Sequence, residues 1–376
     1  MLDRDVCIVD YDVITAYGHG AAALMRGIAS GVSSAKEVTR FSTAQHAAHI
    51  ACCVDGLSYH EGESLVMQMF SRLVERHAIP EEAMLLFAST VGEVDLLEQS
   101  ISGTDTPPRA LIDTALRLRE LLGIRGKTFA ISSACASTLA ACARARTMIA
   151  SGEAELIVVA AADAVTEFVY AGFSSLLALD VNGARPFDAT RSGLTVGEAA
   201  GYLLLTSREY AASHGLTPKA ILRGCGLSND ANHMTGPSRD GAGLATAIEN
   251  AMKQASCATD GIAMIAAHGT GTTFNDAMEL KAFKRIFQQP IPIYSVKGAL
   301  GHTMGSAGLI QVITACEAMH ARVTPLTVGM QTPDPDAVAW AHTAAMPWET
   351  GRDAALIVNA GFGGVNAAVV LGGAYA

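Results

Sequence analysis

The segment KTFAISSACASTLAACARARTMIASG (residues 127–152) places Cys135 between a short predicted strand and a long predicted helix. A strand that turns sharply into a helix leaves this cysteine at the helix N-terminus, where unpaired N–H groups and the dipole favour a thiolate. Such positions can lower a thiol pKa from about 8.5 to roughly 7 or below. Most single cysteines have a purely structural role, and Cys142 on the same helix face is expected to fill the core. The turn alone leaves both roles open for Cys135.

Strand and helix alternate through the rest of the chain as they do in this segment. Predicted strands cover residues 5–18, 83–90, 127–132, 155–165, 201–207, 219–228, 261–270, 291–296, 355–361 and 367–373. Predicted helices cover residues 21–31, 110–123, 137–152, 244–255 and 276–287, with another from about Gly308. This alternation predicts a layered α/β fold with helices covering the sheets. The polar segment 207–218 divides the chain into predicted halves, residues 1–206 and 207–376.

Composition excludes several classes of function. The chain has 376 residues, half of them hydrophobic, and a net charge of −10, which disfavours a nucleic-acid partner. The eight cysteines form no CxxC pair, and the start of the chain shows no secretory leader, so a cytoplasmic protein is expected. No apolar run approaches the roughly 18 residues that span a bilayer. The histidines lack metal-ligand spacing, so no metal site is expected.

Two more glycine-rich strand ends carry polar side chains. AAHGTGTTFNDAMEL (residues 266–280) places His268 directly after an apolar run, followed by the hydroxyls of Thr270 and Thr272. SVKGALGHTMGSAG (residues 295–308) contains a lysine and a second histidine, Lys297 and His302. Active sites of α/β proteins gather at such strand ends, so we expect these side chains to meet Cys135.

The acidic residues that follow His268 have two interpretations. Asp276 is spaced as a helix N-cap, with Glu279 three residues later as in a capping box. An ionic role for Glu279 competes with this capping interpretation.

Six motifs in order carry a resemblance to a known family. They are ISSACAS (131–137), ARPFDATRSGLTVGEAAGYLLL (184–205), SNDANHMTGP (228–237), HGTGTTFND (268–276), VKGALGHTMGSAG (296–308) and GFGGVNA (361–367). Together they resemble the beta-ketoacyl-acyl carrier protein synthases of the Cys-His-His type, condensing enzymes on the thiolase fold. The resemblance implies two similar α/β halves in a layered α-β-α-β-α sandwich.

The resemblance also implies a reaction and its residues. Cys135 would take an acyl group from the phosphopantetheine thioester of a carrier protein, with the N–H groups of Cys135 and Phe362 as oxyanion hole. His268 and His302 would hydrogen-bond the thioester oxygen of malonyl-carrier protein as carbon dioxide leaves. The resulting carbanion would attack the acyl group and yield a 3-oxoacyl product. No cofactor is implied, because both substrates arrive on the carrier.

The resemblance assigns supporting roles to six further residues. Lys297 would order the histidine loop, and Glu279 would be its ion-pair partner. Phe362 would also act as a gate for the acyl chain. The residues expected to bind substrate are Thr270, Thr272, Gly361 and Gly363.

Departures from the family pattern leave the substrate open. Ala360 and Leu194 stand where the family usually has phenylalanine, and the segment before Cys135 is shorter than in fatty-acid elongating members. These changes favour an enzyme of secondary metabolism, making a polyketide or polyene, at least as much as one of fatty-acid synthesis. A non-catalytic partner resembling chain-length factors is the alternative, although such partners usually lack the cysteine. A degradative thiolase is disfavoured because it needs a second cysteine near the C-terminus.

The resemblance implies two kinds of protein partner. Family members usually form dimers, so a homodimer or a heterodimer with a related chain is expected. A carrier protein is acidic, which predicts a basic patch near the entrance to the site. The candidates for that patch are Arg125, Lys127, Arg144 and Arg185.

Overall fold

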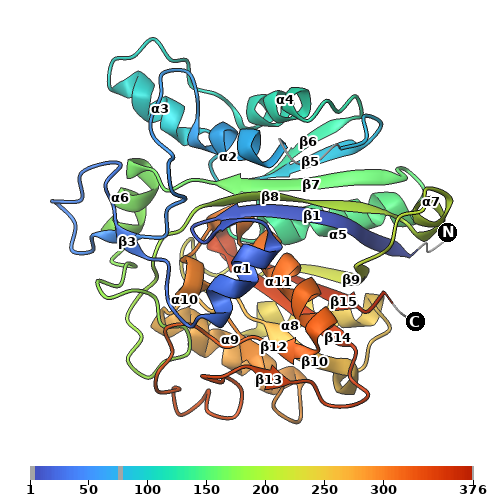
Figure 1. The fold of residues 1–376 in the computed structure, drawn as a ribbon. Helices are drawn as coiled ribbons and strands as arrows, with labels where there is room; N and C mark the ends of the chain where they lie inside the picture. Colours follow the sequence, from blue (N-terminus) through green and yellow to red (C-terminus); the bar gives the residue numbers. More distant parts are fainter. Residues whose placement is uncertain (1–4, 75–78, 375–376) are drawn as a thin grey trace.

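A computed structural model describes residues 5–74 and 79–374 and arranges them in five alternating layers (Figure 1). Helices α2 (Leu65–Val74) and α4 (Leu111–Leu121) cover the outer face of a first layer of strands. Helices α5 (Ser137–Ala150) and α11 (Ala307–Ala321) lie between this layer and a second layer of strands. Helices α8 (Ala242–Gln254) and α9 (Thr273–Ile286) form the fifth layer. The layered α-β-α-β-α prediction is confirmed.

The two strand layers repeat one topology. The strands of the first half are β1 (Val6–Thr15), β5 (Met84–Ala88), β6 (Thr128–Ile131), β7 (Leu156–Asp163) and β8 (Ala199–Ser207). Those of the second half are β9 (Ala220–Asn229), β10 (Ile262–Ala266), β11 (Ile293–Tyr294), β14 (Ala354–Gly361) and β15 (Val365–Gly372). Their spatial orders are β1-β8-β7-β5-β6 and β9-β15-β14-β10-β11, which correspond position by position.

The first and second halves meet both at a strand pair and in the central helical layer. Strands β1 and β9 pair antiparallel through Cys7–Ile221 and Ile8–Ala220. Each half has three parallel strands, β6-β5-β7 in the first and β11-β10-β14 in the second, so several strands end at the same edge. The boundary at residue 206 stays a prediction, since the halves share one packed interior.

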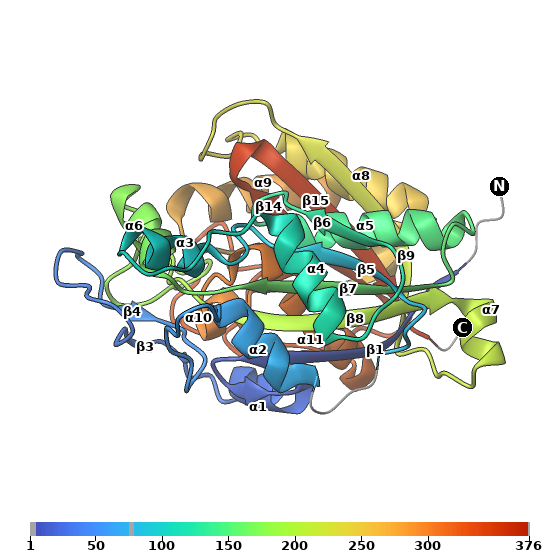
Figure 2. The same cartoon turned by 90° about the horizontal axis from the view of Figure 1, so that it is seen from above.

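The remaining elements lie around these layers. They are β2 (Gly18–His19), α1 (Ala21–Ala29), β3 (Lys36–Glu37), β4 (Ile50–Ala51), α3 (Val94–Ile101), α6 (Glu167–Ser175), α7 (Arg208–Ser213), α10 (Lys297–Leu300), β12 (Val323–Thr324) and β13 (Met346–Pro347). Seen from above, α2 and α4 cross the strands of the first sheet, and α3 lies beside α6 (Figure 2).

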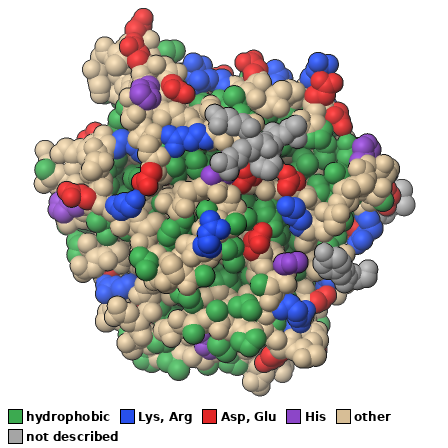
Figure 3. Space-filling view, in the orientation of Figure 1, with side chains coloured by type: hydrophobic (Ala, Val, Ile, Leu, Met, Phe, Trp, Pro, Cys, Tyr) green, Lys and Arg blue, Asp and Glu red, His purple; other side chains and the backbone are tan. Residues whose placement is uncertain are grey.

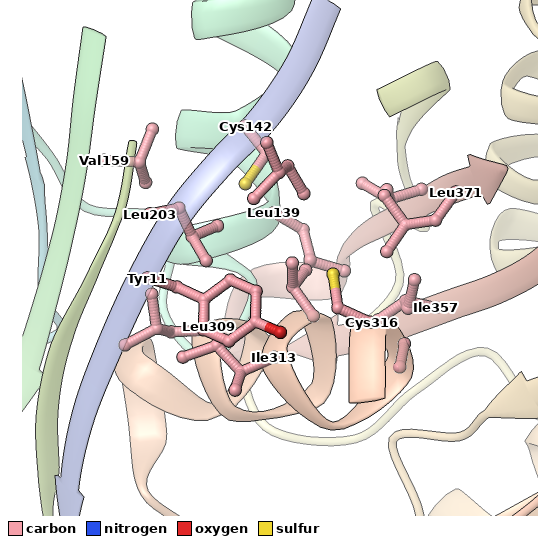
Figure 4. Packing of buried hydrophobic residues seen from close by; sticks show 14 of the residues in the cluster. Tyr11, Leu139, Cys142, Val159, Leu203, Leu309, Ile313, Cys316, Ile357 and Leu371 are labelled. Atoms are coloured by element: carbon pink, nitrogen blue, oxygen red, sulfur yellow. The ribbon is translucent and has the colours of Figure 1, made fainter. Parts of the chain in front are cut away.

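The central core is apolar on both sides of the middle helices. Leu139 of α5 and Leu309 of α11 pack with strand residues of both layers (Figure 4). Cys142 lies in this cluster with 1% of its surface exposed, so its predicted role as core filler is confirmed. Because α5 lies between the two strand layers, it determines where Cys135, two residues before its first residue, is placed.

Within residues 5–74 and 79–374, no helix is both long and apolar enough to cross a membrane. The same part of the chain holds no cluster of side chains suited to a metal ion. Acidic and basic side chains are interspersed on the face shown in Figure 3.

Candidate active site

Cys135 lies at the apex of a tight turn between β6 and α5. Ala134 adopts a left-handed φ of 48°, an uncommon conformation for a residue with a side chain. Ser137 fixes the turn, because its Oγ accepts from the N–H of Ser133 at 2.9 Å and donates to the carbonyl of Ala134 at 2.6 Å. The cysteine is 5% exposed and lines a cavity of about 880 Å³.

His302 contacts the cysteine directly. Its Nε2 lies 3.0 Å from Sγ of Cys135, while its Nδ1 accepts from the N–H of Met304 at 3.2 Å. A neutral imidazole whose Nδ1 accepts carries its hydrogen on Nε2. His302 therefore directs an N–H donor at the sulfur.

His268 stands beside His302 at the end of β10. The two rings are nearly perpendicular, with centroids 5.3 Å apart. Nδ1 of His268 lies 3.2 Å from Nζ of Lys297, an ammonium that can only donate. Nε2 of His268 therefore also carries a hydrogen, and both imidazoles line the cavity as N–H donors.

Lys297 and Glu279 each form a hydrogen bond with a backbone group of His268. The buried ammonium of Lys297 donates to the carbonyl of His268, and the carboxylate of Glu279 accepts from the N–H groups of His268 and Gly269 at 2.6 Å each. Asn275 Nδ2 donates to the same carboxylate at 2.8 Å. The ion pair predicted between Lys297 and Glu279 is not a direct contact, because the peptide group between His268 and Gly269 separates the two side chains, which attract each other across it.

Asp276 is not a helix N-cap. Helix α9 begins at Thr273 with Thr272 as its N-cap, so Asp276 belongs to the first turn. Its carboxylate accepts from the N–H of Thr270 at 3.0 Å and from that of Phe187 at 2.8 Å. Asp276 therefore ties the loop after His268 to a distant segment.

The loop after β14 brings a second N–H group to Cys135. The N–H groups of Phe362 and Cys135 both act on the sulfur to lower the pKa of its thiol. Gly361 allows this approach, because a Cβ there would lie 3.2 Å from the backbone nitrogen of Cys135. Gly363 has a φ of 79° and donates to the carbonyl of Met234 at 2.7 Å, which joins the loop to residues 229–234.

Comparisons with known proteins agree with this geometry. Residues 110–211 match the N-terminal domain of beta-ketoacyl synthases, and residues 219–331 match their C-terminal domain. A 3-oxoacyl-[acyl-carrier-protein] synthase 2 of Vibrio harveyi is 32% identical over 306 residues, which covers 75% of this chain and 73% of that protein. The chain belongs to the beta-ketoacyl synthase family.

Two further relatives of this beta-ketoacyl synthase match along nearly the whole chain. The tetracenomycin polyketide synthase ketoacyl synthase alpha subunit of Streptomyces glaucescens is 27% identical over 414 residues, covering 98% of this chain and 97% of its own. The ishigamide ketosynthase/chain length factor structure superposes with a TM-score of 0.89 at 28% identity, covering 99% of both chains. The thiolase-like fold expected from the sequence is confirmed.

Burial dominates the protonation of this synthase site. It raises the pKa of the Cys135 thiol to about 11, although Lys297 and the two N–H groups act in the opposite direction. The expectation of a lowered thiol pKa is therefore wrong, because burial outweighs the helix terminus. Burial and the nearby Lys297 hold the pKa values of His268 and His302 well below their usual range. Both imidazoles are neutral at pH 7.

The other predicted positions also surround the synthase cavity. Thr270 and Thr272 line it, with their Oγ1 atoms 2.8 Å apart. Leu194 and Ala360 line the same cavity, so both departures from the family pattern face the acyl space. Phe362 lines the cavity and is 38% exposed, and its role as a gate stays a prediction.

Three site residues were not predicted. Phe173 of α6 contacts two site residues, with its ring centroid 6.0 Å from that of Phe362 and 6.2 Å from that of His302. Asn359, next to Ala360 in VNAGFGG, has its Nδ2 3.4 Å from Nδ1 of His268.

Asp163, the third of these residues, positions the loop that carries His302. Fully buried at the end of β7, it accepts from Ser89 Oγ at 2.7 Å and from the N–H of Gly305 at 2.7 Å. In the sequence, Asp163 is marked only by its position as an acidic residue at the end of an apolar strand.

Replacing Glu279 by Gln tests how His268 is held. The amide oxygen of glutamine can satisfy one of the two buried N–H groups and leaves the other facing an NH₂ group. We expect a loss of about 1–3 kcal/mol in the free energy of unfolding and slower malonyl decarboxylation. Denaturant titration and carbon dioxide release measure the two effects. Glu249→Gln on the exposed face of α8 is the matched control, and equal effects of the two changes would contradict this role.

Proposed function

We propose that the protein carries an acyl group on Cys135 and condenses it with malonyl-carrier protein to give a 3-oxoacyl-carrier protein. The observation that carries this proposal is the contact of 3.0 Å between His302 Nε2 and Cys135 Sγ, with His268 beside it in the same cavity. A nucleophile and two neutral N–H donors at one point suit acyl transfer followed by enolate formation.

The first half-reaction loads the cysteine. Its sulfur attacks the thioester carbon of the acyl donor, the carbon–sulfur bond to pantetheine breaks, and the thiol proton passes to the departing sulfur. The negative charge on the tetrahedral oxygen is stabilised by the N–H groups of Cys135 and Phe362. One such donor contributes about 3–4 kcal/mol to transition-state stabilisation.

The second half-reaction uses the two imidazoles. The N–H donors of His268 and His302 bind the thioester oxygen of the malonyl group as its carboxylate leaves as carbon dioxide. The electron pair released becomes an enolate, whose carbon attacks the acyl-cysteine and expels the Cys135 thiolate. The neutral state of both histidines suits a role as hydrogen-bond donors rather than as acids.

The reaction itself tests the proposed function. We expect the purified protein, given acyl- and malonyl-carrier proteins, to form a 3-oxoacyl-carrier protein and release one carbon dioxide per product, with no added cofactor. A chain-length-factor-like role would give neither product nor carbon dioxide. The retained Cys135, His268 and His302 argue against that alternative.

The pathway is proposed to be one of secondary metabolism. Leu194 and Ala360 remove aromatic volume from the cavity wall, which favours chains other than simple saturated ones. Relatives named for tetracenomycin and ishigamide synthesis support this direction. A panel of acyl primers tests it, and equal turnover of ordinary saturated primers would remove the reason to prefer it.

The proposed partners are a carrier protein and a second synthase-like chain in the cytoplasm. Strand β6 is the outermost strand of the first layer, and its Phe129 is 38% exposed. One solved relative is a ketosynthase in complex with its chain length factor, with 25% identity and a TM-score of 0.81. Both a homodimer and a heterodimer agree with an open β6 edge.

The pH dependence follows from the lowered pKa values of the histidines. Since the folded pKa values of His268 and His302 lie below 6.5, we expect malonyl decarboxylation to persist at pH 6 and to decline only at lower pH. Unfolded histidines bind protons below about pH 6.5, so this contribution to stability is lost as pH falls. Initial rates between pH 5 and 8 measure the effect. An acidic limb centred at or above pH 6.5 would contradict neutral histidine donors.

A further inference from the structure

One permanently charged side chain stands out among the described residues on the wall of the cavity that contains Cys135. Among the described residues that line it, Arg239 is the only lysine, arginine, aspartate or glutamate. Arg239 is exposed, whereas His268 and His302 are 3% and 2% exposed. Arg239 therefore lies at the solvent end of the cavity, and the two histidines lie at its inner end.

The geometry around Arg239 leaves its guanidinium available to a ligand. The group stacks over Phe274, with its central carbon 4.9 Å from the ring centroid. Stacking uses the face of the guanidinium and leaves its N–H groups free at the edge. No ion pair of the described residues involves Arg239, and Lys281 Nζ donates to its backbone carbonyl at 2.9 Å. The second cation strengthens the positive potential at this point.

The basic residues predicted from sequence are less suited to this role. None of the four lines the cavity, and Arg125, Arg144 and Arg185 have carboxylate partners at 3.1, 3.6 and 3.0 Å. A carboxylate beside an arginine offsets its positive charge and repels a second anion, so a paired arginine attracts phosphate less than an unpaired one.

We propose that Arg239 binds the phosphodiester of the phosphopantetheine arm while its thioester end reaches Cys135. The inference rests on the proposed function, which requires such an arm to enter this cavity. The arm has one negative charge, its phosphodiester, and the cavity has one permanent positive charge. Guanidinium and phosphate form paired, charge-assisted hydrogen bonds.

The malonyl carboxylate is the other anion that enters the cavity, and it suits Arg239 less well. It must lie beside the buried His268 and His302 to react, away from the exposed arginine. A cation bound to this carboxylate would also stabilise it and oppose the loss of carbon dioxide.

Two small acyl donors separate this role from a packing role of Arg239 on Phe274. One is an acyl-pantetheine thioester. The other is the same thioester with a methyl phosphodiester at the opposite end of the pantetheine, which has the single negative charge of the natural arm. Intact mass spectrometry follows the rate at which each donor acylates Cys135 below saturation. We expect wild type to prefer the phosphodiester by roughly ten- to hundredfold, the range of a charge-assisted contact. Arg239→Ala should lose that preference and keep its rate with acyl-pantetheine.

Matched variants sharpen the comparison. Arg285→Ala, an exposed arginine of α9 that does not line the cavity, should keep the wild-type preference, and Arg239→Lys should keep part of it. Equal slowing of both donors by Arg239→Ala, or a wild type without preference, would overturn the assignment while leaving the proposed function intact. A wild type acylated by neither donor nor by acyl-carrier protein would instead overturn the proposed function, and the inference with it.

Discussion

Cys135→Ala is expected to abolish acyl loading and lower the rate of condensation by about 10⁴-fold or more, the scale seen when a covalent nucleophile is removed. In the proposed mechanism Sγ of Cys135 holds the acyl group between the two half-reactions, and alanine has no atom that can replace it. Malonyl decarboxylation should continue, because the substitution leaves the partners of both histidines in place. Lys297 Nζ still contacts Nδ1 of His268, and the N–H of Met304 still donates to Nδ1 of His302. Condensation is measured as 3-oxoacyl product and decarboxylation as carbon dioxide.

The control for this variant is a thiol outside the cavity, which is more exposed than Cys135. Cys257 lies far along the chain, before β10, and is not among the residues that line the cavity. Cys257→Ala should load and condense as wild type does. Condensation by Cys135→Ala within tenfold of wild type would contradict the assignment of the nucleophile.

His268→Ala is expected to produce the opposite pattern. Loss of one hydrogen-bond donor to the developing enolate should slow malonyl decarboxylation by about 10²–10³-fold. Acyl loading should change little, because the contact to Sγ comes from His302 and the oxyanion donors come from the backbone.

The comparison with His302→Ala and an exposed histidine completes this prediction. His302→Ala should impair both half-reactions, since its Nε2 touches the sulfur, while His60→Ala in an exposed loop should impair neither. Rapid-quench loading and carbon dioxide release separate the two steps. If His268→Ala lost loading as strongly as decarboxylation, the separate roles of the two imidazoles would be wrong.

Much of the fold follows from local sequence pattern. The main strands are apolar runs bounded by glycine or polar residues, and the alternation with helices predicts layers. Helix α6 (EFVYAGFSS) was missed, because glycine, serine and aromatic residues give it little helical propensity. Its start is instead fixed by Thr166, whose side chain accepts from the N–H of Val169.

The positions of the chemical groups were predictable, but their contacts were not. Cys135, His268 and His302 end up together because their strands end at one edge of the layers. The sign of the Cys135 pKa shift depends on burial, which no local pattern reveals. The partners of Asp163 are 74 and 142 residues away in the chain, and only the folded structure brings them together.

The most direct test of the account is the intact mass of the protein after incubation with an acyl-carrier protein. We predict one acyl adduct per chain on wild type, mapped by peptide analysis to Cys135 and missing from Cys135→Ala. No adduct on wild type, or an adduct that persists in Cys135→Ala, would contradict the claim that this cysteine carries the growing chain.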